Sequence, residues 1–303
     1  MKETNNNIKA LFSFFTLSIV ILLAGCAKEE SRDGSTPTAI EPLSSPAIEL
    51  TDSLEYDHPP AVFPTRTPWP MPYTMIMGPL GSIQHTSVPL DLYQKLWKSD
   101  YQIYDLAYGN GIWITIVSNI SNFESQSLVE SKNFPGDDID HALEENMFIT
   151  ELVYGDDIWV VVLSKTSKFS SQNILTSSKF PQTEIDAMSE KGYWISSLAY
   201  GNGLWSVVFS QSENPPLQKI TFESTFSIET IEQAIENNMY LSEAVLADGI
   251  WTFVFSEEML SEQEILALSH WPKDTFLDYA YERNYTEIKF FYTDSMWVIV
   301  GGK

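Results

Sequence analysis

The sequence has little positive charge. Its 303 residues hold 17 Lys and Arg against 41 Asp and Glu, which gives a net charge of −24. Proteins that bind nucleic acid, or that dock on anionic lipid through charge, neutralise phosphates with Lys and Arg. The shortage argues against nucleic acid as a partner and against charge-driven attachment to a membrane. A high net charge favours solubility, and it leaves open an acidic face for a cationic partner.

Cysteine and histidine are also scarce. Cys26 is the single cysteine, so neither an intrachain disulfide nor a thiolate metal cluster can form. The histidines share no ligand spacing and no position in the repeat described below; they are His58, His85, His141 and His270. We therefore predict no metal site and no cofactor.

The longest apolar run near the N-terminus is too short to span a bilayer. It covers residues 10–23, follows Lys2 and Lys9, and closes with Leu23-Ala24-Gly25-Cys26. A basic start, a short apolar run and small residues before a cleavage site are typical of an export signal. The last four residues resemble the lipobox of bacterial lipoproteins.

The lipobox resemblance implies a membrane anchor at Cys26. It implies transfer of diacylglycerol to the Cys26 sulfur, cleavage before this residue, and acylation of the new amino group with a chain such as palmitate. Several acyl chains give stable anchoring. We therefore expect an extracytoplasmic protein, held at the cell surface or, in a cell with two membranes, at the outer membrane or in the periplasm. The residue after Cys26 is Ala27 rather than Asp, which favours the outer membrane if the cell has two membranes.

Residues 26–72 differ in composition from the rest of the chain. They are rich in Pro, Ser, Thr and Glu and show no apolar periodicity. Such a composition predicts a disordered, semi-extended tether, with a root-mean-square span of roughly 35–40 Å if fully flexible. The chain therefore divides into a signal peptide over residues 1–25, a lipidated tether over residues 26–72, and a repeat domain over residues 73–303.

One pattern recurs every 46 residues in this last part. It is marked by a column of tryptophans: Trp113, Trp159, Trp205, Trp251 and Trp297. Self-similarity at a fixed period is the sequence signature of a repeat architecture. We therefore predict five copies of one structural unit.

Each copy opens with a predicted β-hairpin. Strands rich in β-branched and aromatic residues flank a two-residue turn, such as Asn110-Gly111, which favours type I′ geometry. The second strand is an almost continuous apolar run, clearest at residues 159–163, which predicts burial on both faces. The first turn residues form a column of their own: Asn110, Asp156, Asn202, Asp248 and Asp294.

A third, shorter strand and a short helix complete the copy. The strand carries a glutamine column: Gln126, Gln172, Gln218 and, one place early, Gln263. The helix carries an apolar stripe, formed in one copy by Ile139, Ala142, Leu143 and Met147. We expect the helix to pack on the strands through this stripe. We expect the glutamines to cap buried backbone groups, with a ligand-binding role left open.

The two ends of the repeat region complement each other. Residues 286–303 hold a hairpin alone, and residues 74–101 hold a strand and a helix that precede the first hairpin. We therefore predict a closed ring in which the N-terminal strand completes the last unit, because an open solenoid needs polar end caps. The predicted fold class is α/β, a closed five-fold toroid of 46-residue β-β-β-α repeats. A five-bladed β-propeller with one helix per blade is the alternative.

Two families share parts of this pattern. The number and order of elements resemble the pentein fold, a five-fold α/β propeller. The columns resemble the C-terminal repeat region of plant casein-kinase-like protein kinases, on the strength of Gln172, Phe180-Pro181, Gly192-Tyr193 and the strand from Trp205. This likeness covers about residues 74–303 and includes no glycine-rich or catalytic-loop motif of a kinase. It implies a fold and a binding role rather than a reaction.

Candidate sites follow from the columns. Pentein enzymes that modify guanidinium groups use a Cys nucleophile, and Cys26 lies outside the ring, so we predict no catalytic residues of that kind. The turn column from Asn110 to Asp294 offers a cation or sugar site on one face, although the turn type itself accounts for these residues. The tryptophan column from Trp113 to Trp297 offers a ligand channel, although packing between sheet and helix accounts for it as well.

The expected function is that of a monomeric, non-catalytic binding or scaffold lipoprotein of the cell envelope, with an envelope protein or glycan as ligand. The alternatives are an enzyme that acts on envelope glycans or peptides through acidic residues in the ring mouth, and a purely structural envelope component. A deep pocket lined by residues that break the repeat would favour the enzyme. A shallow mouth lined by repeated residues would favour binding.

Overall fold

The computed structural model describes residues 80–119, 123–257, 263–271, 285, 287–292 and 295–302. All of them lie in the second of the chain's two units, Thr67–Lys303. The signal peptide, Cys26, the tether, Asp294 and most of the last predicted helix lie outside the described residues. Among the described helices, none is long and apolar enough to cross a membrane.

The described chain forms five three-stranded antiparallel sheets and four short helices. The first sheet holds β1 (Leu80–His85), β2 (Gln102–Gly109) and β3 (Ile112–Ser118), with α1 (Leu90–Trp97). The second holds β4 (Phe123–Ser131), β5 (Phe148–Gly155) and β6 (Ile158–Thr166), with α2 (Gly136–Glu144). The third holds β7 (Ser171–Ser177), β8 (Trp194–Gly201) and β9 (Leu204–Gln211), with α3 (Gln182–Ser189).

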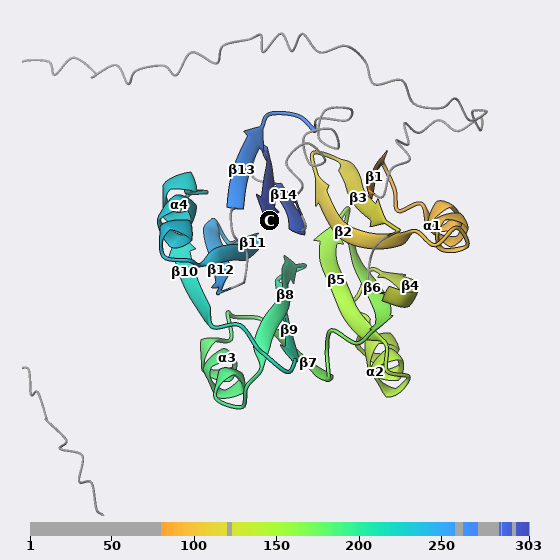
Figure 1. The fold of residues 1–303 in the computed structure, drawn as a ribbon, viewed down its shortest axis with the longest axis horizontal. Coiled ribbons are helices and arrows are strands. Elements are labelled where there is room, and N and C mark those ends of the chain that lie inside the picture. Colours follow the sequence, from red (N-terminus) through yellow and green to blue (C-terminus); the bar gives the residue numbers. More distant parts are fainter. Residues whose placement is uncertain are drawn as a thin grey trace, which may run out of the picture. The chain divides into compact units, whose positions relative to one another are not determined.

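The last two sheets repeat this order. The fourth holds β10 (Gln218–Glu223), β11 (Tyr240–Ala247) and β12 (Ile250–Ser256), with α4 (Ile228–Glu236). The fifth holds β13 (Gln263–Leu268), β14 (Glu287–Tyr292) and β15 (Trp297–Gly302). Figure 1 shows the sheets arranged about a common centre, with β2, β5, β8, β11 and β14 innermost and the helices outside.

The second strand of each hairpin is the central strand of its sheet, as in the order β1-β3-β2. A central strand has neighbours on both edges and packing on both faces. The central strands β3, β6, β9, β12 and β15 are accordingly buried along almost their whole length. The predicted burial of these apolar runs is confirmed.

The sheet boundaries differ from the prediction. The third strand of each predicted copy does not pair with the hairpin before it; it pairs with the hairpin that follows, so β1 pairs with β3 and β13 pairs with β15. The N-terminal strand therefore does not complete the last unit. The sequence did not distinguish the two pairings because each third strand lies between two hairpins with an equally apolar central strand.

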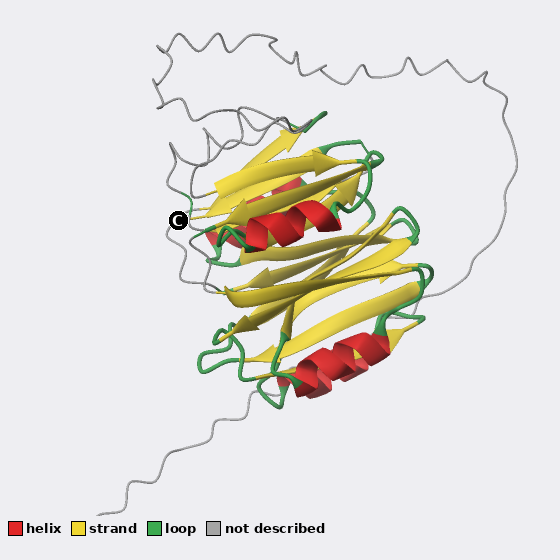
Figure 2. Ribbon diagram, turned by 90° about the vertical axis from the view of Figure 1, so that its right-hand side faces the viewer, coloured by secondary structure: helices red, strands yellow, loops and turns green. Residues whose placement is uncertain are grey.

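The hydrophobic core is divided into five clusters, one between each pair of neighbouring sheets. One cluster joins Val160 and Val162 of the second sheet to the first, and equivalent clusters join the second to the third, the third to the fourth and the fourth to the fifth. The remaining cluster joins Ile288 and Phe290 of the last sheet to Ile114 of the first. Figure 2 shows the strands from the side, with helices on the outer surface.

The helices end earlier than their apolar stripes predict. Helix α2 stops at Glu144, and Asn146 follows it in the left-handed conformation with φ of 59°. The Met147 amide donates to the Ala142 carbonyl at 2.9 Å, which closes the helix end. Met147 therefore packs on the core from the turn after the helix rather than from its last turn.

Candidate functional site

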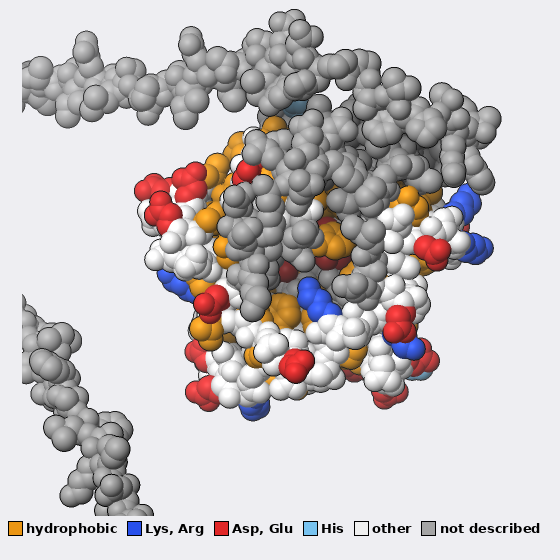
Figure 3. All heavy atoms as spheres, in the orientation of Figure 1, with side chains coloured by type: hydrophobic (Ala, Val, Ile, Leu, Met, Phe, Trp, Pro, Cys, Tyr) orange, Lys and Arg blue, Asp and Glu red, His pale blue; other side chains and the backbone are white. Residues whose placement is uncertain are grey.

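The turn column forms the predicted type I′ turns. Asn110, Asp156, Asn202 and Asp248 have φ of 50–51°, and the residue after each also has positive φ. This conformation suits Asn, Asp and Gly, so the turn accounts for the column. On the face drawn in Figure 3, most of the acidic side chains that are visible lie around the edge of the molecule rather than in one patch. Among the described residues, no group of three or more His, Cys, Asp or Glu is placed to hold a metal ion.

The tryptophan column packs between sheet and helix. Each of these indoles is at most 6% exposed. Trp159 meets Phe134 edge-on at 5.2 Å between ring centroids, and Trp205 meets Phe180 in the same way at 5.0 Å. The phenylalanines belong to the Phe-Pro steps that precede α2 and α3. The column therefore serves the core, and the indoles are too deeply buried to line an open channel.

The glutamine column joins neighbouring sheets. The Gln172 side-chain carbonyl accepts from the Ile149 amide at 2.7 Å, and its amide donates to the Ile149 carbonyl at 2.8 Å and to Ser210 Oγ at 2.9 Å. The pairing of β5 with β6 is interrupted by a bulge between Ile149 and Glu151. Beside this bulge, Gln172 from the next sheet satisfies the backbone amide and carbonyl of Ile149. The predicted capping role is confirmed.

The centre of the sheet arrangement holds a cluster that the sequence reasoning did not identify. Each innermost strand contributes one residue at the same repeat position, opposite the same position of its central strand. The central cluster consists of Asp105, Glu151, Ser197, Glu243 and Lys289. Unlike the turn and tryptophan columns, this column differs in chemistry from copy to copy.

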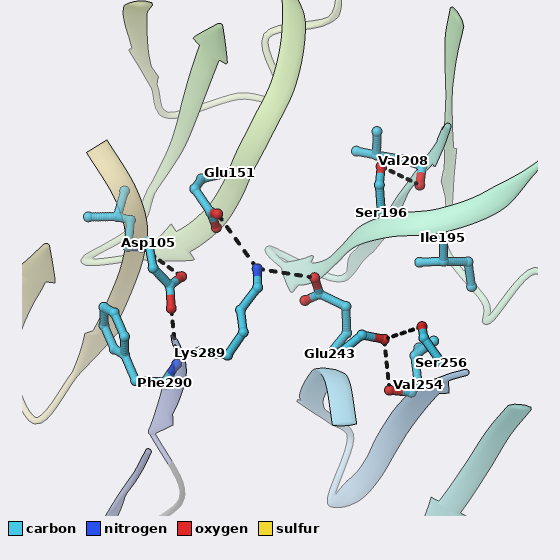
Figure 4. A network of polar contacts seen from close by, with 12 residues as sticks. Asp105, Glu151, Ile195, Ser196, Val208, Glu243, Val254, Ser256, Lys289 and Phe290 are labelled. Carbon is cyan, nitrogen blue, oxygen red and sulfur yellow. Dashed lines mark hydrogen bonds and ion pairs between the residues drawn. The ribbon is translucent and has the colours of Figure 1, made fainter. Parts of the chain in front are cut away.

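Lys289 is the cation on which the acidic side chains converge. Its Nζ lies 3.6 Å from Glu151 Oε1 and 3.8 Å from Glu243 Oε1. Figure 4 shows the amine between these two carboxyl groups, with Asp105 beside them. The Asp105 carboxylate accepts from the Leu106 amide at 2.9 Å and from the Phe290 amide at 3.0 Å. The Glu243 carboxyl likewise accepts from the backbone amide of Leu198.

Burial shifts the protonation of every acid in the cluster. Burial raises the pKa of Asp105 to about 6, although Lys289 and the backbone amides oppose the shift. It raises the pKa of Glu243 to about 7 and that of Glu151 well above its ordinary value, again against Lys289. Burial alone would lower the pKa of Lys289, but the three carboxyl groups raise it well above its ordinary value. The amine therefore stays charged while the acids share protons near neutral pH.

The cluster lines a cavity of about 210 Å³. All five innermost strands contribute to its wall, and apolar positions such as Leu106, Ala199 and Val245 lie between the polar ones. The Lys289 side chain is 30% exposed, so solvent reaches the cluster. Small-ligand pockets are usually mostly apolar with a few converging polar groups. This cavity also gathers polar groups in a concave site, but its exposed wall is more polar than apolar and its volume is smaller than most.

A signal for this cluster exists in the sequence. Each innermost strand is otherwise apolar or hydroxylic at its middle, so a charged residue 46 places apart in four of five copies is unusual. The signal is weak because the three acids do not stand out among 41 Asp and Glu, and because the fifth copy carries a lysine at this position instead of an acid. Only the arrangement of the five strands about one centre brings an amine to carboxyl groups 46 to 184 residues away.

The fold and its centre define a repeat protein of five β-sheets about a polar cluster. The chain belongs to the family described as a domain of unknown function, DUF7477, whose model matches residues 82–251 and 132–284. The two matches overlap, as expected of a chain with internal repeats. No curated protein and no solved structure matches this chain.

Proposed function

We propose that this chain is a membrane-anchored, non-catalytic binding lipoprotein of the cell envelope, whose ring centre is the ligand site. The observation that carries the proposal is the central cavity with its cluster of unlike side chains. The acids of the cluster are held by a lysine and by backbone amides, which favours recognition of a ligand over a reaction. The likeness to the repeats of casein-kinase-like kinases supports the same reading.

The ring itself is part of the proposal. A closed five-fold toroid, pentein-like or in the form of a five-bladed propeller with helices, is supported by the contact between β14 and β2 and by the core cluster shared by the last and first sheets. A second argument comes from the tyrosines that cover glycines. Tyr108 covers Gly155, and Tyr292 covers Gly109 in the same way, so the junction of last and first sheets repeats an internal one.

Ligand binding is tested by thermal unfolding of the full chain in detergent. Envelope peptides and glycan fragments are added one class at a time, because a ligand that binds only the folded state raises the melting temperature. The expected result is a higher melting temperature with one class of ligand. Glu243→Gln in the central cluster should abolish this rise, and Asp248→Asn in the turn column should preserve it. A rise that depends on Asp248 and not on Glu243 would move the site to the turn column.

Anchoring is tested separately at Cys26. Wild-type protein is expected in the membrane fraction and labelled by a palmitate analogue, whereas Cys26→Ser is expected unlabelled and uncleaved. Cleavage of Cys26→Ser at the same site would point to an ordinary signal peptide and overturn the lipoprotein proposal.

One observation favours an enzyme as the second candidate. Carboxyl groups with a pKa near neutrality are the usual general acids of glycoside hydrolysis. In the central cluster, however, the Lys289 amine lies within 4 Å of both Glu151 and Glu243 and takes up one side of the space between them, which leaves too little room for a sugar ring. Hydrolysis of an envelope glycan that is lost in both Glu151→Gln and Glu243→Gln would establish the enzyme and reject the binding role.

A further inference from the structure

We propose that the central cavity binds a small organic cation, whose ammonium group lies beside Ser197 between Glu151 and Glu243. This inference rests on the proposed binding function and names the ligand class of its site. An alkylammonium group is the shared chemistry of a free amine and of a lysine side chain from a protein partner.

The first step is the charge of the cluster. Asp105, Glu151 and Glu243 are three acids, and Lys289 is the one amine at their centre. Outside the cluster, the charge of Lys168 lowers the pKa of Glu151, and Tyr104 raises the pKa of Lys289. A fully ionised centre would carry an excess of negative charge in a buried setting, which is costly unless a cation pairs with it. A second cation would remove that excess.

The second step is a gap in the column. Ser197 occupies on β8 the position that carries a charged side chain on β2, β5, β11 and β14. It is 4% exposed and lines the cavity, and no described residue hydrogen-bonds its hydroxyl group. The residue as a whole is buried, but its hydroxyl oxygen is open to the cavity rather than sealed in the core. The hydroxyl oxygen is available to accept a hydrogen bond from a ligand ammonium.

The third step is the position of the gap. Strand β8 packs against β5 on one side and β11 on the other, which are the strands of Glu151 and Glu243. These two acids hold Lys289 from one side of the centre. An ammonium group beside Ser197 would meet the same two carboxyl groups from the other side, as a second lysine would.

The size of the cavity limits the ligand. A volume of about 210 Å³ corresponds to roughly seven water molecules at about 30 Å³ each. It lies below the range of about 300–1,000 Å³ that is common for drug-sized ligands. A chain of a few carbon atoms with one ammonium group fits this volume, and n-butylamine, which matches the lysine side chain, is the probe.

Binding should tighten as pH rises. The ligand ammonium group keeps its charge between about pH 6 and about pH 8. Asp105 and Glu243, in contrast, lose their protons as pH passes through about 6 and about 7. Glu151 and Glu243 face the ligand from β5 and β11, and Lys289 and Asp105 face it from β14 and β2. Strand β8 adds the phenol of Tyr200 to the cavity wall, and its raised pKa keeps it neutral over this pH range. The cation binds the ionised carboxyl groups, so it displaces protons and is favoured at the higher pH.

The experiment is calorimetric titration of the full chain with n-butylamine at about pH 6 and about pH 8. We expect tighter binding and proton release at the higher pH, and no binding of n-butanol, the uncharged analogue. Ser197→Lys places an ammonium group in the gap and is expected to weaken n-butylamine binding about tenfold or more. Ser197→Ala, which removes only the hydroxyl group, is expected to weaken it by a smaller factor, and Asp248→Asn should bind as wild type does.

The outcomes separate the two sources of the ligand and the two proposals. Binding of n-butylamine together with blocked lysine (Nα-acetyl-lysine methylamide) would indicate a protein lysine, and binding of n-butylamine alone would indicate a free amine. Absence of amine binding, or equal binding by wild type and Ser197→Lys, would overturn the cation site. An envelope ligand that stabilises wild type and Ser197→Lys equally would leave the binding function standing without the cation site. Binding of n-butylamine, with no stabilisation by any envelope peptide or glycan, would leave the cation site standing without the envelope-binding function.

Discussion

At the scale of single residues, the side chain that matters most at the centre is Lys289. It is the one amine among three buried acids, and removing one partner of a buried ion pair leaves uncompensated charge. The charges in the cluster come from four strands far apart in sequence. The lysine is therefore both a local neutraliser and a link between sheets.

Lys289→Met is expected to destabilise the protein by about 3–5 kcal/mol at about pH 8 and by clearly less at about pH 5. Asp105 and Glu243 have a raised pKa in the folded state, so the folded chain binds more protons than the unfolded chain between about pH 4 and about pH 7. Their favourable contribution is present at low pH and is lost as pH rises through this window. Without Lys289 the pKa values of these acids rise further, so the free energy of unfolding falls more steeply as pH rises.

Urea unfolding at the two pH values measures this effect, with the exposed Lys219→Met as the matched control. An equal loss at both pH values would mean that Lys289 acts through packing alone.

At the scale of elements, the contact between one sheet and the next depends on a bulge and a glutamine. Gln126, Gln172 and Gln218 repeat the same three hydrogen bonds at successive junctions. Each joins a backbone irregularity of one sheet to a serine on the central strand of the glutamine's own sheet. The strand that carries the glutamine is therefore bonded both to the preceding sheet and to the central strand of its own sheet.

Gln172→Leu is expected to cost about 2–6 kcal/mol, because it leaves the Ile149 amide and carbonyl buried and unpaired, at about 1–3 kcal/mol for each group. Hydrogen exchange should accelerate at Ile149 before it does elsewhere in β5. The control is Gln233→Leu on the exposed face of α4, which should change stability little. Unchanged stability in Gln172→Leu would mean that water replaces the side chain at the bulge.

The sequence predicted those parts of the fold that depend on local pattern. Turns such as Asn110-Gly111 and the burial of the central strands follow from neighbouring residues, and the structure confirms them. The capping role of the glutamines is also confirmed, although their partners, such as Ile149 for Gln172, lie in the neighbouring sheet and could not be named from the sequence. The pairing of β1 with β3 could not be predicted, because it depends on which of two similar strands lies nearer in space. The central cluster was missed for a related reason: Asp105 and Lys289 are 184 residues apart and meet only when five strands share one centre.

At the scale of the whole molecule, the junction between the last and first sheets carries the proposed ring. Trp271 Nε1 donates to Ser82 Oγ at 3.3 Å, and the indole packs on Trp297 at 5.3 Å between ring centroids. The Phe290 amide donates to Asp105 across the same junction. The two hydrogen bonds join residues 189 and 185 positions apart, almost at opposite ends of the repeat region.

Trp271→Ala is expected to cost about 3–5 kcal/mol, as for other buried tryptophans. Since Trp271 lies at the last junction, hydrogen exchange should accelerate in β2 and β3 of the first sheet as well as in β13 and β15. Phe226→Ala, the equivalent aromatic of the fourth sheet, is the control and should leave the first sheet protected. Faster exchange confined to the fifth sheet would show that the ends are not coupled.

The pairing of β1 with β3 has a consequence for chain connectivity. Each of the described sheets takes its strands from one stretch of chain, and none of the described strands is exchanged between the two ends. The order in which the five stretches are joined is then not fixed by hydrogen bonding. A circular permutant that joins Lys303 to residue 80 through a short linker and opens the chain between β3 and β4 should fold to the same arrangement. The same independence would let a repeat array of this kind arise by tandem duplication of a single 46-residue gene segment.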